Sequence, residues 1–176
     1  MTGTPLAPFS GIVRIHPDTG SIDSGFQVSG VRLGEAIRVI EQPDGRVLVL
    51  GPSRVNEVEH PRFLGRVLAD GSPDPSFTAQ TGEGTVIRAA ALQPDGRIMV
   101  AYTEQTSTSG FVRRLRADGG LENDFSAIAN GPIRSIALSA DGTLAIGGDF
   151  TTVNGQPRGG HALLSPSGSV LAGLAT

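Results

Sequence analysis

Histidines come first as candidate catalytic or metal-binding residues, because the chain contains no cysteine. His16, His60 and His161 lie far apart, and none has a second histidine or cysteine at i+2 or i+4. His161 aligns with apolar positions of earlier repeats, Leu64 and Val112, which indicates a strand position facing a neighbouring element. The histidines therefore predict no metal site.

One charged segment, residues 52–63, brings a histidine together with other polar side chains. We interpret it as a loop between two hairpins that either is simply solvated or makes a weak metal or glycan contact. A shorter loop, residues 103–110, is uncharged except for Glu104. The candidate binding residues are Arg54, Glu57, Glu59, His60 and Arg62.

Known catalytic motifs do not occur in this sequence. It has no phosphate-binding glycine loop, no nucleophile elbow and no HExxH zinc motif. An EF-type calcium loop needs oxygen ligands at alternate positions and a terminal glutamate, whereas Asp70 and Asp74 have Pro73 between them and no such glutamate follows. We therefore predict a protein that is not an enzyme, with no catalytic residue, no metal and no cofactor.

Composition narrows the range of partners. The net charge is −3, so the chain has no basic excess to neutralise phosphates, and we expect no nucleic acid partner. Its apolar stretches are short, which argues against membrane insertion. No signal peptide is recognisable, and we leave the localisation open, with a virion or the cell exterior favoured over the cytoplasm. Aromatic residues are only 5%, without tryptophan, which disfavours a sugar-binding surface.

Two interleaved repeats determine the expected fold. One motif comprises residues 36–51, 86–102 and 132–148, whose turn aspartates lie at intervals of about 50 residues. The other comprises residues 66–77 and 114–125, with an earlier copy at 14–26 and a divergent copy at 163–174. Each motif consists of two short strands around a tight turn, so one repeat contains two hairpins, or four strands.

Aspartate followed by glycine recurs at these turns for a structural reason. Aspartate starts a tight turn, and glycine adopts the positive φ that closes it. In the divergent last copy, Ser167-Gly168 replaces the pair. The turn residues predicted to be structural are Asp44, Gly45, Asp70, Gly71, Asp95, Gly96, Asp118, Gly119, Asp141 and Gly142.

Four strands per 40–50-residue repeat are typical of a β-propeller blade. Between about Gly11 and Leu174, the chain resembles the delta-60 repeat β-propellers of bacterial proteins. The resemblance rests on the motifs QPDGR (residues 42–46 and 93–97), ADGSPDPSF (69–77) and GGDF (147–150). It implies an all-β fold and says little about chemistry, because propellers host many functions.

We therefore predict an N-terminal segment with a leading hairpin (1–30) and blades of four antiparallel strands at 31–84, 85–131 and 132–176. The predicted function is a non-catalytic structural or protein-interaction module of a larger bacterial or bacteriophage assembly, such as a virion or tail component. Its partner would be itself or another protein, since three blades do not close a ring. The alternative is a glycan- or ligand-binding module that acts through residues 52–63 and 103–110.

Two positions leave alternatives open. Glu41 stands where the other repeats have leucine, which indicates either a one-residue deletion, the alternative we favour, or an inward-facing carboxylate. An arginine follows isoleucine in each inner strand, at Arg38, Arg88 and Arg134. These arginines either line a channel that takes an anion or pair with the turn aspartates.

Overall fold

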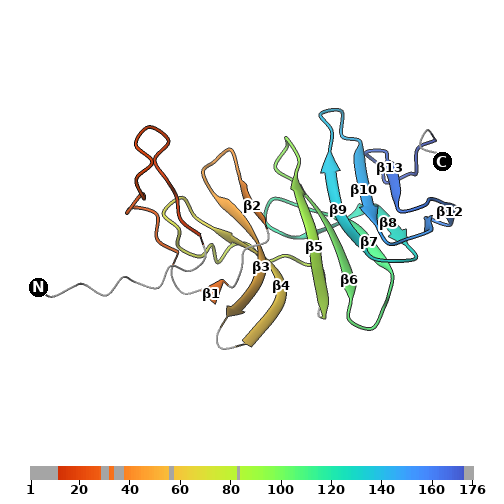
Figure 1. Ribbon diagram of the computed structural model, residues 1–176, viewed down its shortest axis with the longest axis horizontal. Coiled ribbons are helices and arrows are strands. Elements are labelled where there is room, and N and C mark those ends of the chain that lie inside the picture. The colour runs from red at the N-terminus through yellow and green to blue at the C-terminus, as the bar shows by residue number, and fades with distance from the viewer. Residues whose placement is uncertain (1–11, 29–31, 34–37, 56–57, 83, 173–176) are drawn as a thin grey trace, which may run out of the picture. The chain divides into compact units, whose positions relative to one another are not determined.

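A computed structural model describes residues 12–28, 32–33, 38–55, 58–82 and 84–172. Within these ranges the secondary structure is entirely β-strand and turn (Figure 1). The fold class predicted from the repeats is thus confirmed as all-β. The chain forms two compact units, residues 1–75 and residues 76–176, which are described in turn.

The first unit contains one antiparallel sheet. β3 (Val47–Val55) lies between β4 (Val58–Val67) on one side and both β2 (Arg38–Glu41) and β1 (Arg32–Leu33) on the other. A bridge between Val67 and Pro73 continues the sheet beyond β4. Residues 12–28 form a separate hairpin, held by a bridge between Ile15 and Ile22. This is the predicted leading hairpin.

The one-residue deletion that we favoured at Glu41 is wrong. Glu41 pairs with Val47 across the turn, as Leu92 pairs with Ile98 and Leu138 with Leu144 in the other repeats. The register is therefore unbroken, and no residue is missing. Glu41 is exposed. The carboxylate thus occupies the leucine position on a part of the sheet that water reaches.

The prediction of a loop at residues 52–63 is also wrong for most of this segment. β3 and β4 continue as a paired ribbon through this segment, with Ser53 opposite His60 and Arg54 opposite Glu59. Polar side chains suggested a loop, but backbone pairing does not require apolar side chains, and opposite charges across a ladder favour it. Residues 56–57 lie outside the described part of the chain.

The second unit contains two sheets. In the first, β5 (Thr85–Leu92), β6 (Ile98–Glu104), β7 (Gly110–Leu115) and β8 (Leu121–Ala129) pair consecutively. Two short strands, β11 (Thr152–Val153) and β12 (Gln156–Pro157), extend it past β8. The other sheet has the order β13 (His161–Leu164), β10 (Leu144–Gly148) and β9 (Ile133–Leu138).

The predicted count of four strands per blade holds fully only for β5–β8. In the last repeat, the fourth strand is reduced to a bridge between Leu164 and Val170. Its connection from β10 to β13 is long enough to form the β11–β12 hairpin, which joins the sheet of the preceding repeat. In the first repeat, β1 and β2 share one edge of β3.

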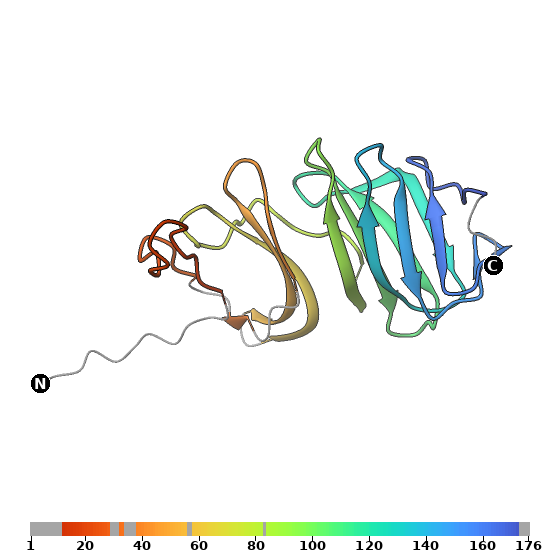
Figure 2. The same ribbon diagram turned by 45° about the horizontal axis from the view of Figure 1, so that its top comes forward.

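The two sheets of the second unit lie face to face, with β9 packed against β5 and β6 (Figures 1 and 2). We call the side of the β5–β8 sheet that the β9–β10–β13 sheet covers its front face, and the side of the β9–β10–β13 sheet turned toward it the back face. The equivalent positions of the first repeat, counted from its turn glycine, take the same names. The front face contributes small residues and the back face large aliphatic ones. The buried residues between the sheets include Ala89, Ala91, Met99, Ala101, Val112, Ile136, Leu144, Ile146, Ala162 and Leu164.

A search of the described residues for helices that are long and apolar enough to cross a membrane found none.

Candidate functional site

All five predicted Asp-Gly turns have one geometry. The aspartate carboxylate accepts a hydrogen bond from the backbone N–H two residues later, at 2.8–3.1 Å. The following glycine has a φ between 80° and 90°. A side chain at this φ would be strained, so glycine is required. The five turns centre on Asp44, Asp70, Asp95, Asp118 and Asp141.

These hydrogen bonds stabilise the ionised form of several turn carboxylates. The Arg97 guanidinium lowers the pKa of Asp95 below its usual value, mainly through a side-chain hydrogen bond. The backbone N–H of Thr143 lowers the pKa of Asp141, and the Ser72 hydroxyl lowers that of Asp70. These three carboxylates are thus charged acceptors for their own turns and are poorly suited to act as general acids.

An arginine–carboxylate pair recurs in the outer hairpin of the repeats. Arg14 donates to Asp23 at 2.7 Å, Arg66 to Asp74 at 2.8 Å, and Arg114 to Glu122 at 2.7 Å. The second and third arginines lie five residues before the turn glycine, and their carboxylates lie three residues after it. Sequence reasoning missed this pair, although the spacing was visible in the repeats.

The last repeat replaces both members of the pair with leucine. Counting from Gly168, Leu163 occupies the arginine position and Leu171 the carboxylate position. The backbone still pairs here, because the Leu171 N–H donates to the Leu163 carbonyl at 2.8 Å. One repeat therefore forms the same hairpin with an apolar pair in place of an ionic one.

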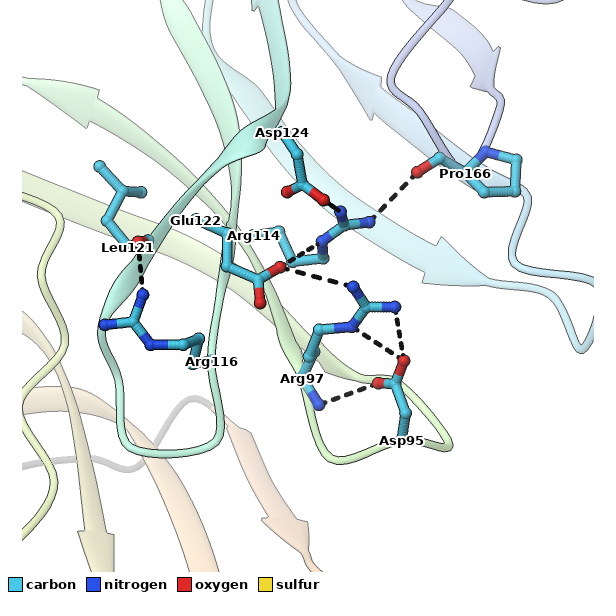
Figure 3. Close-up of polar contacts among 8 residues, drawn as sticks. All are labelled: Asp95, Arg97, Arg114, Arg116, Leu121, Glu122, Asp124 and Pro166. Carbon is cyan, nitrogen blue, oxygen red and sulfur yellow. Dashed lines mark hydrogen bonds and ion pairs between the residues drawn. The ribbon is translucent and has the colours of Figure 1, made fainter.

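Arg114 makes several contacts besides its bond to Glu122 (Figure 3). Its guanidinium donates to Glu122, to Asp124 and to the Pro166 carbonyl, the last at 3.2 Å. It also lies 5.6 Å from the centroid of the Phe125 ring. Pro166 belongs to the next repeat, so Arg114 joins two repeats as well as two strands.

Arg97 extends this network to the inner turn. It pairs with Asp95 and lies 3.5 Å from the Glu122 carboxylate (Figure 3). Glu122 therefore receives two arginines, one from each hairpin of its repeat. The charged side chains of Arg97, Arg114 and Glu122 thus hold the two hairpins of this repeat together.

Glycines of the outer turns also serve a second purpose that the sequence did not reveal. A Cβ on Gly71 would come within 2.8 Å of backbone atoms of Gln27. A Cβ on Gly119 would overlap the Thr78 carbonyl, and one on Gly168 would lie 2.9 Å from the Ser126 oxygen. Each contacted residue directly follows the phenylalanine of the preceding repeat. The glycines therefore let consecutive repeats approach at backbone distance.

The three histidines lie in different elements. His16 lies 3.8 Å from Asp23 in the leading hairpin, and His161 begins β13, half-buried. His60 lies in β4 opposite Ser53. A search for groups of three or more metal-ligating side chains among the described residues found none.

The candidate binding residues Arg54, Glu59, His60 and Arg62 all lie on the β3–β4 ribbon, and their side chains are outside the described part. Glu57 is not described. The second predicted loop, residues 103–110, is shorter than expected, because β6 extends to Glu104 and β7 begins at Gly110. The ribbon brings Arg54 and Glu59 to directly opposite positions.

The arginine of the last inner strand pairs differently from both alternatives. Arg134 bonds to Asp149, and this contact lowers the pKa of that carboxyl. The turn aspartate Asp141 instead bonds to Thr143. The turns use local partners because a backbone N–H two residues away is always within reach.

A third surface, at the end of the second unit, is left open by the residues that the structure describes. The side of the β9–β10–β13 sheet that faces away from β5–β8 carries small and apolar residues that are half-buried or exposed. We call it the terminal face. Its strand residues are paired across the sheet and comprise Ser135, Ala137, Ala145, Gly147, His161 and Leu163.

Antiparallel sheets that follow the sequence repeat and stack face to face define a repeat protein of the β-propeller class. Residues 42–77, 93–125 and 139–170 match the model of the family described as "Domain of unknown function (DUF5122) beta-propeller". These matches cover more than half of the chain, so the chain belongs to this family. The family match confirms the resemblance to delta-60 repeat propellers. No curated protein and no solved structure matched the chain.

Proposed function

We propose that this β-propeller domain is a non-catalytic structural or protein-interaction module of a larger bacterial or bacteriophage assembly. The observation that carries the proposal is the terminal face, whose half-buried or exposed residues resemble the covered face of the preceding repeat. An apolar blade face of this kind suits contact with another protein. The virion or tail setting is proposed from the repeat type.

The use of charge in the described repeats agrees with a module that acts without catalysis. Arg97, Arg114 and Glu122 are bonded to one another or to neighbouring turns. The carboxylates with shifted pKa are shifted downward, whereas a general acid at neutral pH needs a raised pKa. The charged side chains therefore support the fold.

Fractionation tests this proposal. Antibody against the chain would be used to follow it through size separation of extracts or particles from the organism that encodes it. We expect the chain in assemblies well above 18.1 kDa and above any self-association product. Recovery only as free chain or its own oligomer, or turnover that is lost on a single carboxylate substitution, would contradict the proposal.

A second candidate function is glycan or ligand binding through the β3–β4 ribbon. It is favoured by the register, which places Arg54 opposite Glu59 and Ser53 opposite His60 on one hairpin. A glycan array with the unmodified chain and the variant Arg62→Ala/His60→Ala tests it. Specific binding that the double substitution abolishes would favour this candidate, and equal signals from both proteins would exclude a role for these two residues.

A further inference from the structure

The terminal face corresponds, position by position, to the front face of the preceding repeat. Counted from the turn glycines, Ala137 and Ala145 correspond to Ala91 and Met99, and His161 corresponds to Val112. The residues of the preceding repeat are almost completely buried, with Val112 at 0% exposure. On the terminal face, Ala137 is exposed and His161 is half-buried. The same surface is thus covered once and uncovered once.

The residues that cover the front face of β5–β8 indicate which kind of surface packs on such a face. Large aliphatic residues of the next repeat, including Ile136, Leu144 and Ile146, fill the space above the small side chains of β5 and β6. The inner strands of the terminal face likewise carry small residues, Ala137, Ala145 and Gly147. The complementary occupant is therefore the aliphatic back face of another repeat of this kind.

The replaced ion pair makes the terminal face more apolar than its counterpart. Arg114 and Glu122 bond to each other on the front face of the preceding repeat, whereas Leu163 and Leu171 stand at the equivalent positions. Both leucines are half-buried. A half-buried leucine at a position that is ionic in the other repeats favours a surface that loses its water on binding.

A suitable back face lies on the first repeat of the same chain. The leading hairpin covers part of β3 and β4 on this face, since Phe26 packs with Val49 and Val67. The hairpin leaves the inner strand β2 open: Val39, which pairs with Val49, is 48% exposed, and Glu41 is exposed. The chain thus carries an uncovered front face and a half-covered back face.

We propose that the terminal face binds the back face of the first repeat, around Val39, in a second copy of this chain. This rests on the proposed function as an interaction module and names its partner. The contact is head-to-tail, and a second identical contact forms when each copy offers both faces. Two copies supply six blades and two additional hairpins, within the range of about 4–8 blades in closed propellers.

Sedimentation velocity at micromolar concentration tests the proposal with three variants. Ala145→Arg puts a charge in the middle of the terminal face, and Val39→Arg puts one on the back face. Ala140→Arg makes the same change in the exposed β9–β10 turn and is the control. We expect twice 18.1 kDa for the unmodified chain and the control, and at least about tenfold weaker association for each face variant.

Mixing the two face variants distinguishes head-to-tail contact from other geometries. Each variant alone has both contacts damaged, but a mixed pair retains one intact contact, so association should partly return. An undiminished dimer of Val39→Arg would overturn the proposal, because it would mean that terminal faces pair with each other. A folded monomer of the unmodified chain would overturn it as well.

His161→Val provides a test that misfolding cannot mimic. Valine is the residue at the equivalent covered position, Val112. Because burying an imidazole costs more than burying an isopropyl group, we expect tighter association than in the unmodified chain. Weaker association of a folded variant would contradict the proposal. If the chain is monomeric yet resides in a large assembly, this inference fails while the proposed function remains.

Discussion

Replacing Arg114 with leucine removes a buried guanidinium that bonds to Glu122, Asp124 and the Pro166 carbonyl. Breaking a buried ion pair costs about 3–5 kcal/mol, because the remaining partner is left without compensation. The carboxylates here regain water more easily, since the Glu122 side chain is 19% exposed and that of Asp124 is 63% exposed. We therefore expect Arg114→Leu to lower the free energy of unfolding by about 2–4 kcal/mol.

The last repeat shows how this loss can be recovered. It carries Leu163 and Leu171 where the preceding repeat has Arg114 and Glu122. Replacing a buried ion pair by apolar residues of similar volume is often neutral or stabilising. The double variant Arg114→Leu/Glu122→Leu should therefore lie within about 1 kcal/mol of the unmodified chain.

Urea denaturation followed by the fluorescence of Tyr102, the only tyrosine in a chain without tryptophan, measures these differences. Arg116→Leu is the control, because the Arg116 side chain is 52% exposed and should change stability by no more than about 1 kcal/mol. A double variant as unstable as the sum of both single variants would refute the view that these pairs are replaceable supports of the hairpin.

Three further predictions concern turns and connections. Gly119→Ala should destabilise the chain far more than Gly155→Ala, because a Cβ at Gly119 overlaps the Thr78 carbonyl while one at Gly155 meets nothing within 4 Å; melting temperatures compare them. Since the pKa values of Asp95 and Asp141 lie below the ordinary 3.8, their contribution to stability is complete above that pH and is lost as the pH falls through their folded-state values. The melting temperature should therefore drop in acid, and less steeply in Asp95→Asn/Asp141→Asn; equal slopes would contradict the assignment. Asn130→Ala removes the acceptor of the Thr151 and Thr152 N–H groups, at 2.8 and 3.0 Å, so hydrogen exchange at these amides should accelerate, with unchanged exchange as the opposing result.

Hairpins and turns could be predicted from the sequence because their signals are local. An aspartate that bonds to the N–H two residues later, followed by a glycine, fixes a turn such as that at Asp95 whatever surrounds it. The alternation on either side of the turn then fixes the strands. The all-β class and the propeller repeat therefore followed from the sequence alone.

The β3–β4 ribbon could not be predicted in this way. Residues 52–63 have the charge and proline content of a loop, while their pairing depends on the partner strand that lies beside them. The role of Arg114 could not be predicted either, because its guanidinium donates to the carbonyl of Pro166, which lies 52 residues later in the next repeat. Contacts between repeats set these features, and a local sequence window does not contain them.

Glu41 illustrates the same limit within a strand. Its charge at a leucine position suggested a deletion, because a carboxylate costs free energy where the sheet is covered. The unbroken pairing with Val47 shows that no residue is missing, and the exposure of Glu41 shows that the described residues leave this part of the back face open. The glutamate at this leucine position therefore reflects the exposure of β2 at Glu41 and not a change in strand length.

We have proposed that the terminal face of this chain binds the open back face of another copy. Because the chain has no cysteine, single substitutions Ala137→Cys and Val39→Cys give two proteins with one thiol each. Mixing them with a short bifunctional maleimide and analysing the products by mass tests the contact directly. We expect mainly cross-links between residue 137 of one copy and residue 39 of the other. Cross-links that join only residue 137 to residue 137 would contradict the proposed contact, and so would the absence of cross-links in a folded chain.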